Sequence, residues 1–135
     1  MRIQVLGESE QPLYTHVVSL EPGEEVIESI GRAARAENIE VAGFTAIGGL
    51  HRTKLGFYND ETGGFDEIPL TEGHVEVLSL MGEITREDGE PKVHGHVVLG
   101  RSDGSTVGGH LLRGIVQPIL IANVFELAHV RASRH

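Results

Sequence analysis

The spacing of apolar residues has a helical period in one segment of the chain. From Glu24 to about Asn38, apolar side chains recur every three or four residues, at Val26, Ile27, Ile30, Ala33 and Ala34. Acidic residues near the start, including Glu25 and Glu28, favour the positive end of a helix dipole. The pattern therefore predicts one helix between about residues 24 and 38.

Most of the remaining chain has short runs of β-branched and other apolar residues that are typical of strands. They predict strands at about residues 1–7, 14–20, 40–49, 53–59, 74–84, 92–99, 106–113 and 115–128. Clear turn sequences lie at 59–64, 86–89 and 101–105. Because strands joined by short turns are usually antiparallel neighbours, we expect an α+β fold with a mainly antiparallel sheet and one main covering helix.

Length and composition limit the kind of protein further. A chain of 135 residues fits one compact domain, which we place at residues 1–135. The sequence has no cysteine, which excludes disulfides, thiolate metal sites and cysteine nucleophiles. The longest apolar run, residues 118–122, is far shorter than the ~20 residues that span a bilayer. We expect a soluble cytoplasmic protein without a membrane segment.

The charge is negative overall and unevenly distributed. The formal net charge is -9. Residues 1–90 carry 18 acids and 6 bases, a charge of -12, whereas residues 91–135 carry 2 acids and 5 bases, a charge of +3. Contacts with DNA phosphates require cationic side chains. Because the net charge is negative, we do not expect the chain to bind DNA directly.

The strongest chemical signal is a group of histidines in the C-terminal third. His94 and His96 are separated by one residue, so in a strand their side chains lie on one face. A hairpin centred on Asp103 would place His110, in the sequence Gly-Gly-His, opposite His96. A slip of two residues would bring it opposite His94, on the same face.

Three imidazoles on one face could form an open metal site with room for water or another ligand. Zinc is the first choice, and iron, nickel and copper also accept imidazole. Histidines on an exposed strand can also be ordinary polar residues, so this second interpretation stays open. If the site is catalytic, metal-bound water is the expected nucleophile, and the sequence identifies no catalytic side chain or base for it.

Other candidate sites are weaker. Glu76 and Glu83 are seven residues apart, which puts them on opposite faces of a strand and gives no carboxylate pair. Glycines at 43, 48 and 49 lack the spacing of a phosphate-binding loop. His51 and His74 could line a pocket, and we expect surface or terminal positions for the rest, namely His16, His129 and His135.

Two motifs carry a family resemblance. The sequence Gly-His-Val-Glu-Val-Leu-Ser-Leu at residues 73–80 resembles the signature of the plants-and-prokaryotes conserved (PPC) domain. The sequence Thr-Val-Gly-Gly-His at 106–110 resembles a later element of that domain. The predicted strand at 14–20 and the helix after it are similar to its opening, so the resemblance covers about residues 10–128.

The resemblance implies a twisted, mainly antiparallel sheet with helical cover, assembled as a homotrimer. It implies a divalent metal at His94, His96 and His110, as in prokaryotic members with the same HxH and GGH sequences. In plant members the domain follows an AT-hook and associates with partners, and this chain lacks the Arg-Gly-Arg-Pro core of that hook. By resemblance, a partner surface would include Gly73, His74, Val75, Glu76, Val77 and Leu78.

Three functions follow as hypotheses. The first is a homotrimeric protein that holds a divalent metal and accepts a small-molecule ligand there. The apolar segment 115–127 supports assembly, because it has more apolar surface than one helix can cover. The second is a DNA-associated regulatory or interaction module that acts through a partner. The third is a trimeric scaffold whose histidines have no role in binding.

Overall fold

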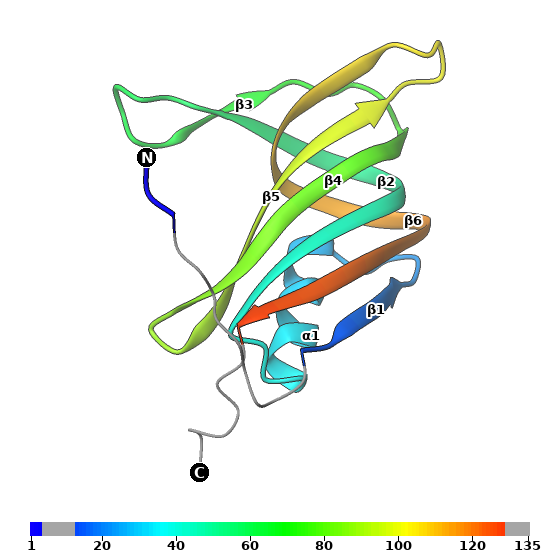
Figure 1. The fold of residues 1–135 in the computed structure, drawn as a ribbon. Coiled ribbons are helices and arrows are strands. Elements are labelled where there is room, and N and C mark those ends of the chain that lie inside the picture. Colours follow the sequence, from blue (N-terminus) through cyan, green and yellow to red (C-terminus); the bar gives the residue numbers. More distant parts are fainter. Residues whose placement is uncertain (4–12, 129–135) are drawn as a thin grey trace.

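The computed structural model describes residues 1–3 and 13–128, which contain six strands and one helix (Figure 1). Their order along the chain is β1 (Thr15–Leu20), α1 (Val26–Ala36), β2 (Val41–Tyr58), β3 (Phe65–Ile68), β4 (His74–Glu87), β5 (Glu90–Gly100) and β6 (Thr106–Ala128). A mostly antiparallel sheet with one helix is therefore confirmed for these residues. No helix in the described ranges is long and apolar enough to cross a membrane.

The strands form one sheet in the order β1-β6-β5-β4-β2-β3, and every pairing is antiparallel. β2 pairs with β6 as well as with β4. The pairings of β6, β5, β4 and β2 therefore close into a ring, to which β1 and β3 add at β6 and β2.

Two pairs of predicted strands are in fact two long strands. The expected strands at 40–49 and 53–59 form the single strand β2, and those at 106–113 and 115–128 form β6. β2 and β6 pair with each other across both predicted breaks. Register shifts between His51 and Lys54, with Arg52 at φ 50°, absorb the irregularity without ending the strand. The prediction of separate strands was wrong because a bulge resembles a turn in sequence.

The ends of the chain and one short strand also differ from expectation. The expected strand at 1–7 is not present at residues 1–3, and 4–7 lie outside the described residues. The four-residue strand β3 was not predicted, because its sequence Phe-Asp-Glu-Ile is short and half charged. Pairing with residues 55–58 of β2 holds it in place.

The helix contributes its apolar side to the core. Val26, Ile30 and Ala34 are buried, and they join the core residues of all strands except β3. Glu25 caps the helix start, since its side chain accepts a hydrogen bond from the backbone N–H of Glu28. The helix expected at 24–38 is therefore confirmed at Val26–Ala36.

Side chains along β4 and β5 alternate between the core and the opposite face. Leu80 and Val97 are buried, whereas Met81 and His96 are exposed. Met81 pairs directly with His96, and His96 pairs with His110 of β6. His94 lies two residues before His96 on β5, so the alternation and the pairing place all three histidines of the predicted site on the face that points away from the core.

Candidate metal centre

A tight turn positions the strands that carry the histidines. The N–H of Arg101 donates to the carbonyl of Ser105 at 2.8 Å, and the N–H of Gly104 donates to the carbonyl of Arg101 at 2.9 Å. The Asp103 carboxylate accepts bonds from the Ser105 hydroxyl and N–H, and these bonds lower the pKa of Asp103. β5 and β6 then pair with His96 opposite His110, which confirms the register predicted from a hairpin centred on Asp103.

His94, His96 and His110 come together in the structure. One ring nitrogen of each lies within 4.8 Å of the others. The ring centroids are 5.0 Å apart for His94 and His96, 4.6 Å for His94 and His110, and 5.8 Å for His96 and His110. Imidazole nitrogens gathered in this way are a ligand set that zinc and other divalent ions accept.

One ring nitrogen of His110 is enclosed by the protein. Its Nδ1 atom is buried and has no hydrogen-bond partner among the described residues. Burial, and then the positive charges that His94 and His96 carry when protonated, lower the pKa of His110 below its usual 6.5. The ring is therefore neutral at pH 7, which is the form that ligates metals. A buried, neutral, unsatisfied nitrogen beside two more imidazoles fits a metal ion.

Aromatic residues from β2 and β3 lie against the cluster. The Phe65 ring stacks on His110, with centroids 4.3 Å apart and an interplanar angle of 26°. Tyr58 meets Phe65 edge to face at 5.7 Å. Gly109, before His110, permits β2 and β3 to pack close to β6, because a Cβ at Gly109 would lie only 2.9 Å from both the Gly56 carbonyl oxygen and the Ile68 side chain. Sequence analysis missed Phe65 because it missed β3.

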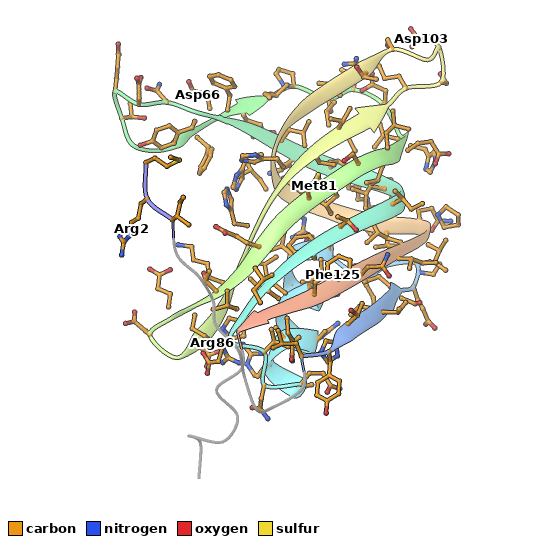
Figure 2. The ribbon with its side chains drawn as sticks, viewed as in Figure 1. Arg2, Asp66, Met81, Arg86, Asp103 and Phe125 are labelled. Atoms are coloured by element: carbon orange, nitrogen blue, oxygen red, sulfur yellow. The ribbon has the colours of Figure 1, made fainter. Side chains whose placement is uncertain are left out.

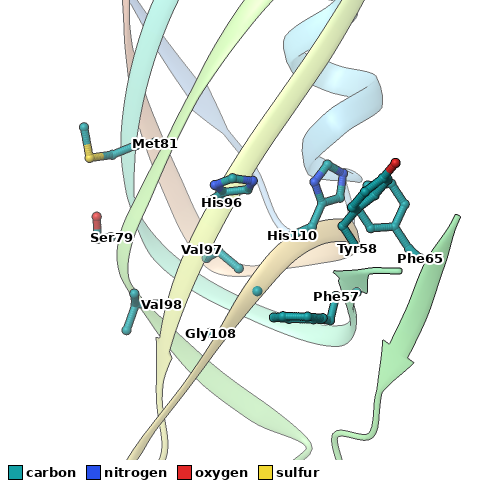
Figure 3. Close-up of a pocket in the computed structure, with 12 residues that line it drawn as sticks. Phe57, Tyr58, Phe65, Ser79, Met81, His96, Val97, Val98, Gly108 and His110 are labelled. Carbon is teal, nitrogen blue, oxygen red and sulfur yellow. The ribbon is translucent and has the colours of Figure 1, made fainter. Parts of the chain in front are cut away.

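A cavity of about 630 Å³ opens beside the histidines (Figure 3). His96 and His110 form part of its wall. The other lining residues are mainly aromatic, aliphatic or glycine, namely Gly56, Phe57, Tyr58, Phe65, Ser79, Met81, Val97, Val98, Gly108 and Gly109. The histidine cluster therefore borders an apolar space large enough for a small organic molecule.

Comparison with known proteins places this arrangement in a family. Residues 7–127 match the model of the Plants and Prokaryotes Conserved (PCC) domain, the domain abbreviated PPC above. The chain belongs to the PPC family. The resemblance seen in the motifs at 73–80 and 106–110 is thereby confirmed.

Three relatives illustrate the likeness. A plant- and prokaryote-conserved protein of Pyrococcus horikoshii is 34% identical, with a TM-score of 0.82 over 92% of this chain and 87% of its own. A metal-containing protein of Archaeoglobus fulgidus is 30% identical, with a TM-score of 0.78 over 85% of this chain and 80% of its own. The AT-hook motif nuclear-localized protein 14 of Arabidopsis thaliana is 34% identical over 121 residues, 85% of this chain, and the chain spans 28% of its length.

A carboxylate that sequence analysis set aside lies next to the cluster of this PPC protein. Glu83 of β4 pairs with His94 of β5, and its Oε1 atom is 3.8 Å from Nδ1 of His94. From the sequence we considered only Glu76 as a partner for Glu83, and its spacing excluded a carboxylate pair. The hairpin turns at Asp88 and Gly89, so Glu87 pairs with Glu90 and Glu83 pairs with His94. A turn centred on the predicted range 86–89 would have placed Glu83 opposite Lys92, two residues away.

The remaining histidines have other surroundings. His51 of β2 pairs with His74 of β4, and neither belongs to the three-histidine cluster or lines its cavity. His16 was expected at the surface, and this was wrong. Its side chain is only 17% exposed, and its Nε2 atom is 3.2 Å from Oε1 of the buried Glu126. His129 and His135 lie outside the described residues.

The PPC signature segment at residues 73–78 alternates between core and surface. Val75 and Val77 are 3% exposed and belong to the core. His74, Glu76 and Leu78 are exposed, and Nε2 of His74 lies 3.4 Å from Oε1 of Glu76. A partner that binds this segment could therefore contact the side chains of His74, Glu76 and Leu78, but not those of Val75 and Val77.

Proposed function

We propose that this PPC protein binds a divalent metal ion through His94, His96 and His110. Zinc is the first choice, and iron and nickel are alternatives. The observation that carries the proposal is the convergence of three imidazole nitrogens within 4.8 Å. The buried, unpartnered Nδ1 of His110 supports it. So does the likeness to the metal-containing protein of Archaeoglobus fulgidus.

Three protein ligands leave at least one coordination position for water or another ligand. The metal would supply Lewis acidity or a lowered pKa of bound water at that position. The chain's own contribution is to hold three imidazoles on paired strands β5 and β6. We assign no catalytic side chain.

Elemental analysis of untagged protein, purified without a nickel column, tests the proposal. We expect about one metal ion per chain, and its loss in the single variants His94→Ala, His96→Ala and His110→Ala. His51→Ala is the matched control, because His51 also lies on a strand and is outside the cluster. Wild-type protein without stoichiometric metal, and without a melting shift on adding zinc, nickel or iron, would contradict the proposal.

We infer further that residues 1–135 form one domain that assembles as a homotrimer. In this assembly α1 covers one side of a twisted sheet and a neighbouring subunit meets exposed apolar side chains, among them Met81 and Phe125 (Figure 2). Other exposed apolar residues of the sheet support this, namely Val17, Ile47, Leu78, Ile119, Ile121 and Leu127. Such a set is typical of a covered interface.

Light scattering tests the assembly. A trimer should have about three times the 14.6 kDa mass of one chain. A mass of one chain at micromolar concentration would contradict it. The cytoplasmic location expected from the sequence remains a prediction.

The second candidate function is a regulatory or interaction module that acts near DNA through a partner. The likeness to an Arabidopsis AT-hook motif protein favours it. The net charge of -9 argues against direct contact with duplex DNA. We therefore expect weak duplex binding at about 150 mM salt in an anisotropy titration. Tight binding with a steep salt dependence would instead assign contacts to basic residues such as Arg101, Arg113 and Arg131.

A further inference from the structure

The cavity and the histidine cluster share two residues. His96 and His110 belong to the cluster and also line the cavity. A molecule in the cavity can therefore approach the same imidazoles that would hold the metal. An open coordination position at this ion would face water or a cavity occupant.

The aromatic wall is exposed in a way that the fold does not require. Phe57 is 70% exposed, Tyr58 is 55% exposed and Phe65 is 43% exposed. All three belong to β2 or β3 and line the cavity together with Met81. Figure 3 shows Tyr58 and Phe65 beside His110. Aromatic rings next to a cavity favour a flat apolar body, which they can contact by stacking or edge to face.

The strand floor leaves room for that body. Gly108 of β6 pairs with Val98 of β5 and lines the cavity, so the pleat of β6 has no side chain there. A Cβ built at Gly108 lies 3.1 Å from the Val97 carbonyl oxygen and 3.8 Å from Val98. A small side chain at this position would therefore enter the cavity with only a slight adjustment of its neighbours.

The charge of the metal-bound site favours a ligand with a negatively charged group. None of the residues that line the cavity is acidic. Three neutral imidazoles around a divalent ion leave a charge of about +2, which an anionic oxygen donor would offset. Glu83 lies near His94 and is not part of the cavity lining. The negative charge at the cavity is therefore expected to come from the ligand.

We propose that this cavity binds a small organic acid, with its carboxylate at the metal and an aromatic body against Phe57, Tyr58 and Phe65. This proposal rests on the proposed metal site. The volume of about 630 Å³ is in the range of small-molecule sites and exceeds what a carboxylate alone would fill. Acetate should therefore bind far more weakly than an aromatic acid.

The experiment uses 2-naphthoate as the probe, with acetate and 2-naphthalenemethanol as comparison compounds. Titration calorimetry on the zinc-loaded full chain should show 2-naphthoate binding at least about tenfold tighter than either compound, since each lacks one of the two contacts. Metal-free protein should show the same loss. In the cobalt-loaded protein, 2-naphthoate should change the visible absorption of the ion, which reports coordination directly.

Two variants separate the cavity from the metal ligands. Phe57→Ala should weaken 2-naphthoate binding by about five- to tenfold and leave the zinc content unchanged. Gly108→Val should weaken it by at least a similar factor, because its side chain fills the space. Tyr14→Ala is the aromatic control, since Tyr14 is 45% exposed and does not line the cavity.

The outcomes distinguish this proposal from the metal site. Stoichiometric zinc with no 2-naphthoate binding, or with binding that ignores Phe57→Ala and Gly108→Val, would overturn the ligand proposal and leave the metal site intact. Binding that is equal with and without metal, with no change in the cobalt spectrum, would overturn the role of the carboxylate. Protein that takes up no metal would overturn both. Phe57→Ala that converts an oligomer into a monomer would assign the cavity to a neighbouring subunit and overturn the ligand proposal.

Discussion

Two histidine sites in this protein, His16 with Glu126 and the cluster of His94, His96 and His110, differ in the hydrogen-bond partners of their ring nitrogens. At the junction of β1 and β6, His16 faces the Glu126 carboxylate at 3.2 Å, and the N–H of Tyr14 donates to the same carboxylate at 3.3 Å. At the other site, His110 presents a buried Nδ1 without a hydrogen-bond partner among the described residues. The first arrangement pairs the imidazole with a carboxylate of the same chain, whereas the second leaves a ring nitrogen free to bind an added group.

The difference separates a structural histidine from a ligand by its surroundings. A buried carboxylate such as Glu126 is stabilised by a hydrogen-bonding imidazole and contributes to the packing of two strands. Three imidazoles that face one another repel when protonated and offer each other no acceptor when all act as donors. Such a cluster is most stable when neutral nitrogens share a cation.

The largest expected effect is the loss of zinc affinity when a histidine of the three-histidine cluster is removed. His110→Ala should lower zinc affinity by more than about a hundredfold, because a ligand contributes more than an outer hydrogen-bond partner, whose loss costs about 10- to 100-fold. Competition with a zinc chelator measures the change. His16→Ala should bind zinc as the wild type does. Equal zinc affinity in both variants would remove the distinction between the two groups.

The next largest expected effect is the loss of stability when the contact between His16 and Glu126 is removed. His16→Ala should lower the free energy of unfolding by about 1–3 kcal/mol, because it leaves the buried Glu126 carboxylate with one hydrogen bond fewer. Urea denaturation measures this loss. The control is His74→Ala, which removes an exposed pair with Glu76 and should cost less than about 1 kcal/mol. Similar losses for the two variants would show that burial of the pair does not matter.

Acidification should sharpen the comparison in the metal-free protein. The pKa of His110 is lowered below 6.5 in the folded state, first by burial and then by His94 and His96. As the pH falls below about 6.5, the unfolded state takes up this proton before the folded state does, so folding becomes less stable. The stability is fully present above that pH.

Denaturation at pH 7.5 and pH 5.5 checks the sign of this effect. The loss on acidification should be smaller in His110→Gln, which cannot take up the proton. The difference between the two proteins isolates His110, because all other titratable groups are common to both. An equal loss in both proteins would contradict the role of His110.

The sequence predicted what depends on short-range pattern. The helix period from Val26 to Ala34 and the turn around Asp103 are local, and both led to correct elements and to the His96–His110 pairing. The predicted turn at residues 86–89 is centred one residue before the observed turn at Asp88 and Gly89, so it did not give the pairing of Glu83 with His94. The hairpin around Asp103 was therefore the most informative signal for the site.

Long-range contacts explain what was missed. Arg52 sits at a bulge whose strand continues because β6 pairs on both sides of it. Phe65 belongs to a short strand that exists only by pairing with β2, and its stacking on His110 could not be read from spacing. His16 is separated by 110 residues along the chain from Glu126, whose carboxylate it contacts. Such contacts depend on the whole sheet.

The smallest expected effect tests whether the metal cluster also has a carboxylate partner. Glu83 lies 3.8 Å from Nδ1 of His94 and is 63% exposed, so solvent weakens their interaction. A carboxylate at this nitrogen would orient the ring and make its other nitrogen a better ligand.

Glu83→Gln should therefore weaken zinc binding by up to about tenfold, the low end for an outer partner, without changing the stoichiometry. The matched control is Glu76→Gln, which removes the same charge beside His74 instead. If both variants weaken zinc binding equally, and the loss disappears at high salt, the effect of Glu83 is only its long-range charge. A loss confined to Glu83→Gln that persists at high salt would mean that the cluster, like His16, depends on a specific carboxylate contact. Both histidine sites would then contain a carboxylate contact, and only the three-histidine cluster would have further ring nitrogens that can bind a metal.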